Sequence, residues 1–176
     1  MSTPETAAPP VPRPSRCWPN DPDYLDGRTE IRLPAERLLH AYWDADILDP
    51  SGVPPPQIIS VADDFEVRFR LELDGGLWQC MAGDWAFDVG FTPIGSGSGF
   101  NLRDHLPAGT LEVKNWKGCK TTCIELRVRV PAGTIPADRY DGTLYETGAK
   151  FQLHCCDKPA PVVGFEALEE YQFYTP

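Results

Sequence analysis

Two runs of alternating apolar and polar residues, one on each side of a glycine turn, constrain the fold more than any other feature of the chain. In the run FEVRFRLEL at 65–73 every second residue is apolar, and the residues between are Glu or Arg. The run WAFDVGF at 85–91 has a similar alternating pattern, with apolar residues at Trp85, Phe87 and Val89. Side chains alternate between the two faces of a strand, so this period of two predicts strands with one buried face each. We expect the two runs to be neighbouring strands around one shared interior.

Further short segments with strand-like patterns follow at spacings near ten residues. They lie at 28–33, 58–61, 110–116, 123–130, 142–147, 150–155, 162–165 and 170–174. Residues 34–48 fit both a helical stripe and a strand, and we expect a helical turn followed by a strand. The 176-residue chain also has 19 prolines and 15 glycines, which indicates many turns and little long helix. These features predict an all-β, antiparallel β-sandwich of seven to nine strands.

The first 27 residues differ in composition from the rest of the chain. They are rich in proline and almost free of aliphatic side chains, so burial cannot offset their ordering entropy. We expect a disordered proline-rich arm at 1–27, pinned at its end by Trp18 and Tyr24, and a single domain at 28–176. The PPVPRP stretch of the arm favours polyproline II and is a candidate docking peptide, although a solvated tail is the commoner use of such a segment.

The charge balance excludes several classes of partner. A formal net charge of −10 opposes binding to nucleic acid or to an anionic membrane, because each phosphate contact needs a cation. No stretch approaches the roughly 18 apolar residues of a membrane span. The amino terminus lacks the charged-then-apolar order of a secretory signal. We therefore expect a cytoplasmic location, with no nucleic-acid or membrane partner.

The six cysteines raise the questions of disulfides and of metal. Without a secretory signal, free thiols are favoured over disulfides. Cys119, Cys123, His154 and Cys155 are ligand types that bind zinc. Against zinc, residues four apart in a strand lie roughly 13 Å from each other, and adjacent Cys155 and Cys156 point to opposite faces of a strand. We expect inert thiols and no bound metal or other cofactor, while a bridge between Cys119 and Cys123 is left open.

A catalytic constellation is not visible in the sequence. The segment GSGSG at 95–99 has glycine where a nucleophile elbow needs serine, and it lacks the lysine of a phosphate-binding loop. The three histidines stand in unlike contexts, with no acid or nucleophile at a diagnostic spacing. Asp44, Asp46 and Asp49 lie near a turn and could hold a weakly bound ion, but a solvated or capping role is expected. We therefore expect a non-enzymatic role, while an enzyme built from residues scattered along the sequence is left open.

The passage RVRVPAGTIPADRYDGTLYE at 127–146 resembles the passage between strands E and F of immunoglobulin-like domains. The resemblance implies that Tyr140 is a corner tyrosine bonded back to the upstream loop and that Trp85 packs between the sheets. The chain departs from the antibody pattern because residue 142 is glycine, so the bridging cysteine pair is missing near Tyr140. An immunoglobulin-like sandwich is expected, and no activity is implied, since unrelated functions share this architecture.

Aromatic residues outside the inward register are the candidate binding residues. Trp78 and Trp116 fall off that register and, with Tyr171 and Tyr174, are expected to form an exposed cluster. Such a cluster suits binding to another protein, and this is our first hypothesis for the function. Self-association of the chain is left open. The alternative is a sugar or small apolar ligand stacked on Trp78 and Trp116, because flat rings cover the apolar faces of sugars.

Overall fold

The structure is a computed structural model that describes residues 16–18, 27–31, 39–49, 57–95, 97–117, 123–135, 144–156 and 158–176. Several expectations concern residues outside these ranges. They are the proline-rich stretch of the arm, pinning by Tyr24, the helical turn before residue 39, the corner role of Tyr140 and any role of Cys119.

Within the described ranges the chain forms ten strands and two short 3-10 turns. The strands are β1 (Arg28–Ile31), β2 (His40–Leu48), β3 (Ile58–Ser60), β4 (Phe65–Asp74), β5 (Ala82–Pro93), β6 (Phe100–Asn101), β7 (Glu112–Lys117), β8 (Cys123–Val130), β9 (Leu144–Cys155) and β10 (Lys158–Tyr174). The turns are η1 (Leu77–Cys80) and η2 (Leu102–Asp104). The ambiguous stretch at 34–48 contains strand β2, as expected for its second half. Strand β1 lies at the edge of its sheet.

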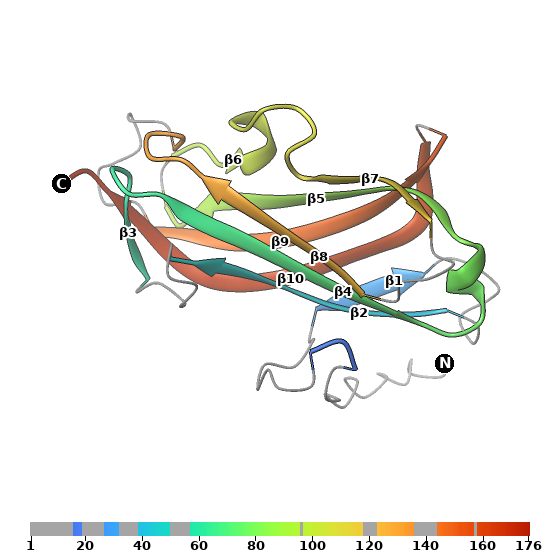
Figure 1. Cartoon of the computed structure of the whole chain (residues 1–176). Coiled ribbons are helices and arrows are strands. Elements are labelled where there is room, and N and C mark those ends of the chain that lie inside the picture. Colours follow the sequence, from blue (N-terminus) through green and yellow to red (C-terminus); the bar gives the residue numbers. More distant parts are fainter. Residues whose placement is uncertain are drawn as a thin grey trace, which may run out of the picture.

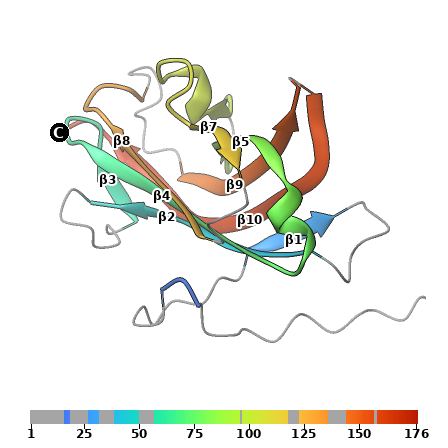
Figure 2. The ribbon, with the colours of Figure 1, turned by 45° about the vertical axis from the view of Figure 1, so that its right-hand side comes forward.

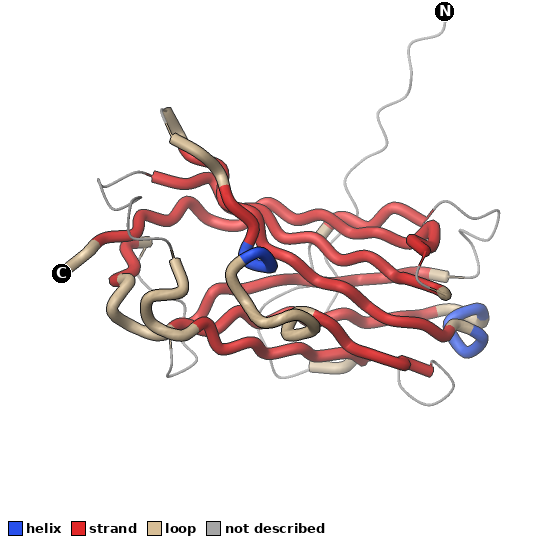
Figure 3. The backbone as a smooth tube through the Cα atoms, turned by 90° about the horizontal axis from the view of Figure 1, so that it is seen from above, coloured by secondary structure: helices blue, strands red, loops and turns tan. Residues whose placement is uncertain are grey.

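The strands form two sheets that face each other, so the prediction of an all-β sandwich is confirmed. One sheet has the order β2-β4-β8. The other has the order β1-β10-β9-β5-β6, with β3 beside β10 and β7 beside β5. The pairs are antiparallel except for β3 and β10, which run parallel. Figure 1 shows the two sheets as layers, and Figure 3 shows that the strands run along the long axis of the molecule.

The two alternating runs become β4 and β5, and their bulky side chains share one interior as predicted. The ring centroids of Phe69 and Phe87 lie 4.9 Å apart across it. The two strands are not paired with each other, however. β4 bonds to β2 and β8 in the smaller sheet, whereas β5 bonds to β9, β6 and β7 in the larger one. The glycine turn and η1 carry the chain from one sheet to the other instead of closing a hairpin.

The centre of the core is aromatic, and glycines make room for it. Trp43 of β2 is fully buried and meets Phe151 of β9 edge to face, with ring centroids 4.9 Å apart. A Cβ atom on Gly27 would stand 2.5 Å from the Trp43 Nε1, and a Cβ atom on Gly164 would stand 2.7 Å from it. Trp85 is also fully buried, as the sequence pattern predicts.

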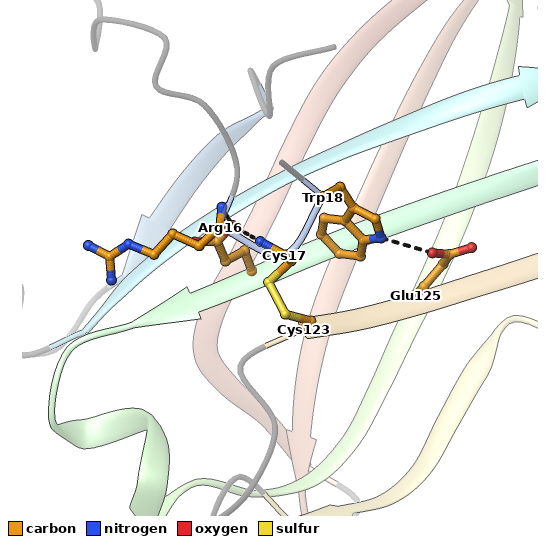
Figure 4. The surroundings of a disulfide bond; sticks show 6 residues. Arg16, Cys17, Trp18, Cys123 and Glu125 are labelled. Carbon is orange, nitrogen blue, oxygen red and sulfur yellow. Dashed lines mark hydrogen bonds between the residues drawn. A yellow bond between two sulfur atoms is a disulfide. The ribbon is translucent and has the colours of Figure 1, made fainter. Parts of the chain in front are cut away.

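Residues 16–18 lie against the outer face of the smaller sheet and are covalently attached to it. Cys17 and Cys123 form a disulfide across a separation of 106 residues (Figure 4). The indole Nε1 of Trp18 donates a hydrogen bond of 3.1 Å to Glu125, and the Arg16 N–H donates one of 3.0 Å to Glu72. Trp18 thus pins this part of the chain, as expected. The expectation that Cys123 is a free thiol is wrong, because its sulfur is bonded to Cys17. The same bond rules out the alternatives of a zinc ligand and of a bridge to Cys119.

This N-terminal segment changes the surroundings of the charged residues beneath it. Arg70 and Glu72 point outward from β4 as predicted, yet each is only 1% exposed. The Arg70 guanidinium binds the carboxylate of Asp44 on β2, with an Nε to Oδ1 distance of 3.0 Å, and lies 5.6 Å from the centre of the Trp18 ring. The expected solvated role of Asp44 is therefore wrong. Burial raises the pKa of Asp44 to about 6, although the hydrogen bond from Arg70 opposes the change.

Candidate functional site

The outward face of the larger sheet carries a row of residues with almost no side chain. The strand registers place Ala167 of β10 beside Gly148 of β9, and Gly148 beside Gly90 of β5. Asn101 of β6 continues the row beyond Gly90. Because residues paired across antiparallel strands stand side by side on the same face, this row forms a strip across the sheet where the backbone is bare.

Larger side chains border this strip on both sides. One border is formed by Phe165 and Lys150, which are paired across β10 and β9. The other is formed by Glu170, Glu146 and Thr92, paired across β10, β9 and β5. The two borders are four residues apart along each strand that has no bulge, which corresponds to roughly 13 Å. The missing side chains of the middle row therefore create a groove that crosses the strands.

The structure has an open groove of about 570 Å³ at this place. Its lining includes all three residues of the bare strip and most of the bordering residues. The lining residues are Gly90, Thr92, Asn101, Glu146, Thr147, Gly148, Ala149, Lys150, Phe165, Glu166 and Ala167. They come from four strands, and their sequence positions span 78 residues from the first to the last.

The groove combines one exposed aromatic ring with polar groups of several kinds. Phe165 is 49% exposed, which is unusual for a side chain of this size. Glu146 supplies a carboxylate, Asn101 an amide and Thr92 a hydroxyl. The ammonium of Lys150 lies 3.4 Å from the Asp88 carboxylate, so part of its charge is compensated. Such a surface offers hydrogen-bond donors and acceptors and a flat apolar platform, with no excess of positive charge.

Neither glycine of the groove is required by backbone conformation, and Gly148 is not required by crowding. Neither Gly90 nor Gly148 has a positive φ. A Cβ atom on Gly148 would make ordinary contact, at 3.6 Å, with the backbone oxygen of Glu166. A Cβ atom on Gly90 would stand 3.2 Å from the Asn101 side chain. Position 148 could therefore hold a larger residue without a change in the strand.

The aromatic residues that were expected to form an exposed cluster do not lie together. Trp116 is only 9% exposed and packs edge to face against Trp85, and Tyr171 is only 4% exposed. The expected exposure of these two residues is wrong. Burial raises the pKa of Tyr171 to about 12. Trp78 is half-buried in η1, and Tyr174, at the end of β10, is 41% exposed. The turn η1 lies at the end of the sandwich opposite the C-terminus (Figure 1).

The sequence does not predict Phe165, Gly90 and Gly148 as residues of one groove, because their positions relative to one another depend on how the strands pair. The run ETGAKF at 146–151 does alternate, with Glu146, Gly148 and Lys150 on one face, so the sequence contains the signal for an outward glycine. That it lies beside Gly90 and Ala167 follows only from the pairing of three strands. Phe165 ends the short strand expected at 162–165, and the sequence pattern does not show whether its side chain points outward or inward.

The fold and the groove define the class: a β-sandwich with a groove across one face. Within the described residues, no group of three acidic, histidine or cysteine side chains could hold a metal ion. No protein-family model matches the chain, and no curated protein matches it. Among solved structures, it is similar to one described as the C-terminal domain of wzt. The TM-score is 0.48 and the identity 9%, over 86% of this chain and 80% of that one. A likeness this weak supports no functional argument.

A helix with the length and hydropathy of a membrane span does not occur among the described residues.

Proposed function

We propose that the protein is a non-enzymatic binding module that holds a segment of a neutral carbohydrate chain in the groove across β10, β9, β5 and β6. The observation that carries the proposal is the exposed Phe165 ring beside a bare strip of backbone, bordered by hydroxyl, amide and carboxylate groups. Sugars have apolar faces that stack on aromatic rings and hydroxyls that both donate and accept hydrogen bonds. Glu146 and the overall charge of −10 disfavour an anionic ligand.

Affinity electrophoresis tests this function directly. The protein is run through native gels that contain neutral glucans, mannans, galactans or xylans, and through one that contains an anionic polysaccharide. We expect retardation by at least one neutral polymer. Phe165→Ala removes the stacking platform and should weaken binding about tenfold. Gly148→Leu fills the floor of the groove and should abolish binding.

A matched control separates filling of the groove from a general effect of leucine. Gly76→Leu adds the same atoms at a position where a Cβ atom would meet nothing within 4 Å, and where the φ of −77° suits any residue. This variant should bind like the wild type. Absence of retardation by every neutral polymer, or equal retardation of Gly148→Leu and wild type, contradicts the proposal.

A second candidate function, binding to another protein, is favoured by the distribution of exposed apolar side chains. Ile58, Leu144 and Ile94 lie at the same end of the larger sheet, since Ile58 and Leu144 both pair with Gln172 and the Ile94 N–H bonds to the Leu144 carbonyl. Tyr174 is exposed at the same end. We call these four residues the terminal patch. Exposed apolar patches of this kind mark protein interaction surfaces.

Sedimentation and pull-down experiments with a charged variant test the terminal patch. Leu144→Asp combined with Ile94→Asp should reduce self-association of the purified protein, or remove a partner that the wild type captures. Binding of polysaccharide should persist in this variant, because neither residue lines the groove. If both proteins are monomeric and capture the same material, the patch has no such role.

The Cys17–Cys123 disulfide bears on the cellular compartment in which the protein functions. The cytoplasmic location expected from the sequence fits poorly with the Cys17–Cys123 bond, because cytosolic thiols keep most cysteines reduced. We infer that the folded chain functions in an oxidising compartment. Thiol counting on protein isolated under alkylating conditions tests this, and a modified Cys17 would contradict it.

A further inference from the structure

The hairpin between β9 and β10 ends in two adjacent cysteines whose thiols lie side by side. Cys155 and Cys156 are both exposed, and their sulfur atoms are 3.8 Å apart. Adjacent residues of an extended strand point to opposite faces, which was the sequence argument against joint ligation. Cys156 instead has a φ of +54°, in the left-handed region, and this turn brings its sulfur to the same side as that of Cys155. The expectation of opposed directions is therefore wrong.

The separation of the two sulfur atoms matches that of two ligands on one tetrahedral metal ion. Zinc binds cysteine sulfur at about 2.3 Å, and two such sulfurs at the tetrahedral angle are separated by about 3.8 Å. A linear ion would place its two sulfurs farther apart, at twice the bond length. The thiol pair can thus chelate zinc without a change in the backbone of the hairpin.

The pair supplies only half of the ligands that a structural zinc ion takes. Such sites have four protein ligands, and within the described part of the chain no third cysteine, histidine or carboxylate joins the pair in a metal-binding group. The hairpin projects away from the rest of the sandwich (Figure 2), so a second molecule can approach its tip. We propose that Cys155 and Cys156 bind one zinc ion together with the same two residues of a second copy of this chain, which forms a zinc-bridged dimer.

Charge at the hairpin tip is compatible with this site. Binding exchanges protons for metal: four thiols and one Zn²⁺ give a four-thiolate zinc centre of charge −2 and release four protons, without oxidation or reduction. Lys158 lies opposite Cys155 in the register of the hairpin. The dimer thus has two Lys158 residues in the same hairpins as the four thiolates, and their charge is opposite in sign to that of the centre.

The inferred compartment gives the thiols a reason to be bound. Two exposed thiols in contact are readily oxidised where the Cys17–Cys123 disulfide persists. Zinc has no redox chemistry and holds cysteines as thiolates that are occupied by the metal. This zinc site lies at the hairpin tip, away from the terminal patch and outside the lining of the groove. It therefore does not depend on the carbohydrate function.

Metal titration of the full chain, with Cys155 and Cys156 reduced, tests the proposal. Cobalt(II) alone is added first, because tetrahedral cobalt bound to thiolates absorbs strongly in the visible region, and zinc is then added to displace it. We expect saturation at one metal per two chains, together with conversion from monomer to dimer in sedimentation experiments. Cys155→Ser and Cys156→Ser should each abolish both effects.

A neighbouring histidine provides the matched control. His154 lies next to the thiols, and His154→Ala should leave stoichiometry and dimerisation unchanged, because the four ligands are cysteines. Circular dichroism of the serine variants checks that the sandwich is intact. One metal per chain in a monomer, loss of binding in His154→Ala, or formation of a Cys155–Cys156 disulfide even in the presence of zinc would each overturn the proposal.

Discussion

Asp44 and Asp64 have chemically identical side chains, yet the fold shifts their pKa values in opposite directions. Asp44 lies beneath the N-terminal segment, and burial raises its pKa from the ordinary 3.8 to about 6, against the opposing effect of Arg70. Asp64 lies at the exposed end of β4's sheet, where hydrogen bonds from Arg129 and from the Ala132 N–H lower its pKa. Solvation and hydrogen bonding thus act with opposite signs on the two groups.

This difference predicts opposite pH dependences of stability. The folded chain holds the Asp44 proton more tightly than the unfolded chain does, so the stabilisation is complete below pH 3.8 and is lost as the pH rises through 6. Relative to Asp44→Asn, the free energy of unfolding of the wild type should fall between pH 4 and pH 7 by up to about 3 kcal/mol. Urea unfolding followed by tryptophan fluorescence at several pH values measures it.

Asp64→Asn serves as the control of opposite sign. A lowered pKa stabilises the fold above pH 3.8, so the wild type should exceed this variant in stability at neutral pH, and the difference should vanish in acid. If the stability difference between wild type and variant changed with pH in the same direction for both variants, burial would not be the cause of the raised pKa of Asp44.

The sequence could predict which residues of β4 face outward, because alternation fixes the face of each side chain. It could not predict which outward residues are buried. Arg70 and Glu72 are covered by residues 16–18, and nothing in the pattern of 65–73 indicates that a distant segment returns to that face. The error over Trp116 has a different cause. The pairing of β5 with β7 shifts register between Gly83 and Trp85, and Asn115 has a φ of +54°, so simple alternation fails there and Trp116 packs on Trp85 in the core.

At the level of strands, β9 and β10 were expected as four short strands and are two long ones. The expected strands leave out residues 148–149 and 166–169. In the structure β9 continues through Gly148, because β5 and β10 bond to it on both sides. A register shift between Ala167 and Glu170 shows that the second break was partly correct. Pairing partners, which the sequence does not specify, decide the length of a strand.

Glycines of these two strands have contrasting environments, and this leads to a second prediction. Gly164 of β10 points inward, where an added Cβ atom would stand 2.2 Å from the Phe151 ring and 2.7 Å from Trp43 Nε1. Gly164→Ala should therefore cost about 1–3 kcal/mol or more of folding free energy through overpacking. Gly148→Ala points outward and should be neutral or slightly stabilising. Thermal unfolding of both variants measures the contrast, and equal effects would refute the inward packing of Gly164.

In the whole molecule the two sheets divide the features of interest between opposite faces. The outer face of β2, β4 and β8 carries the disulfide and the buried Arg70–Asp44 pair, while the outer face of β5, β9 and β10 carries the groove. The all-β class was predictable because it depends on local alternation and turns. The Cys17–Cys123 pair was not, since it joins residues 106 positions apart, and neither flanking sequence identifies the other.

The separation of the faces predicts that stability and binding can be changed independently. Cys17→Ser with Cys123→Ser opens a closed loop of this length and should lower the free energy of unfolding by about 2–5 kcal/mol. Sites that share no partners and are separated by the core contribute additively. Polysaccharide binding of the double variant should therefore equal that of the wild type at temperatures where both are folded. Urea unfolding and affinity electrophoresis on the same samples measure the two quantities, and a parallel loss of both would show that the faces are coupled through the core.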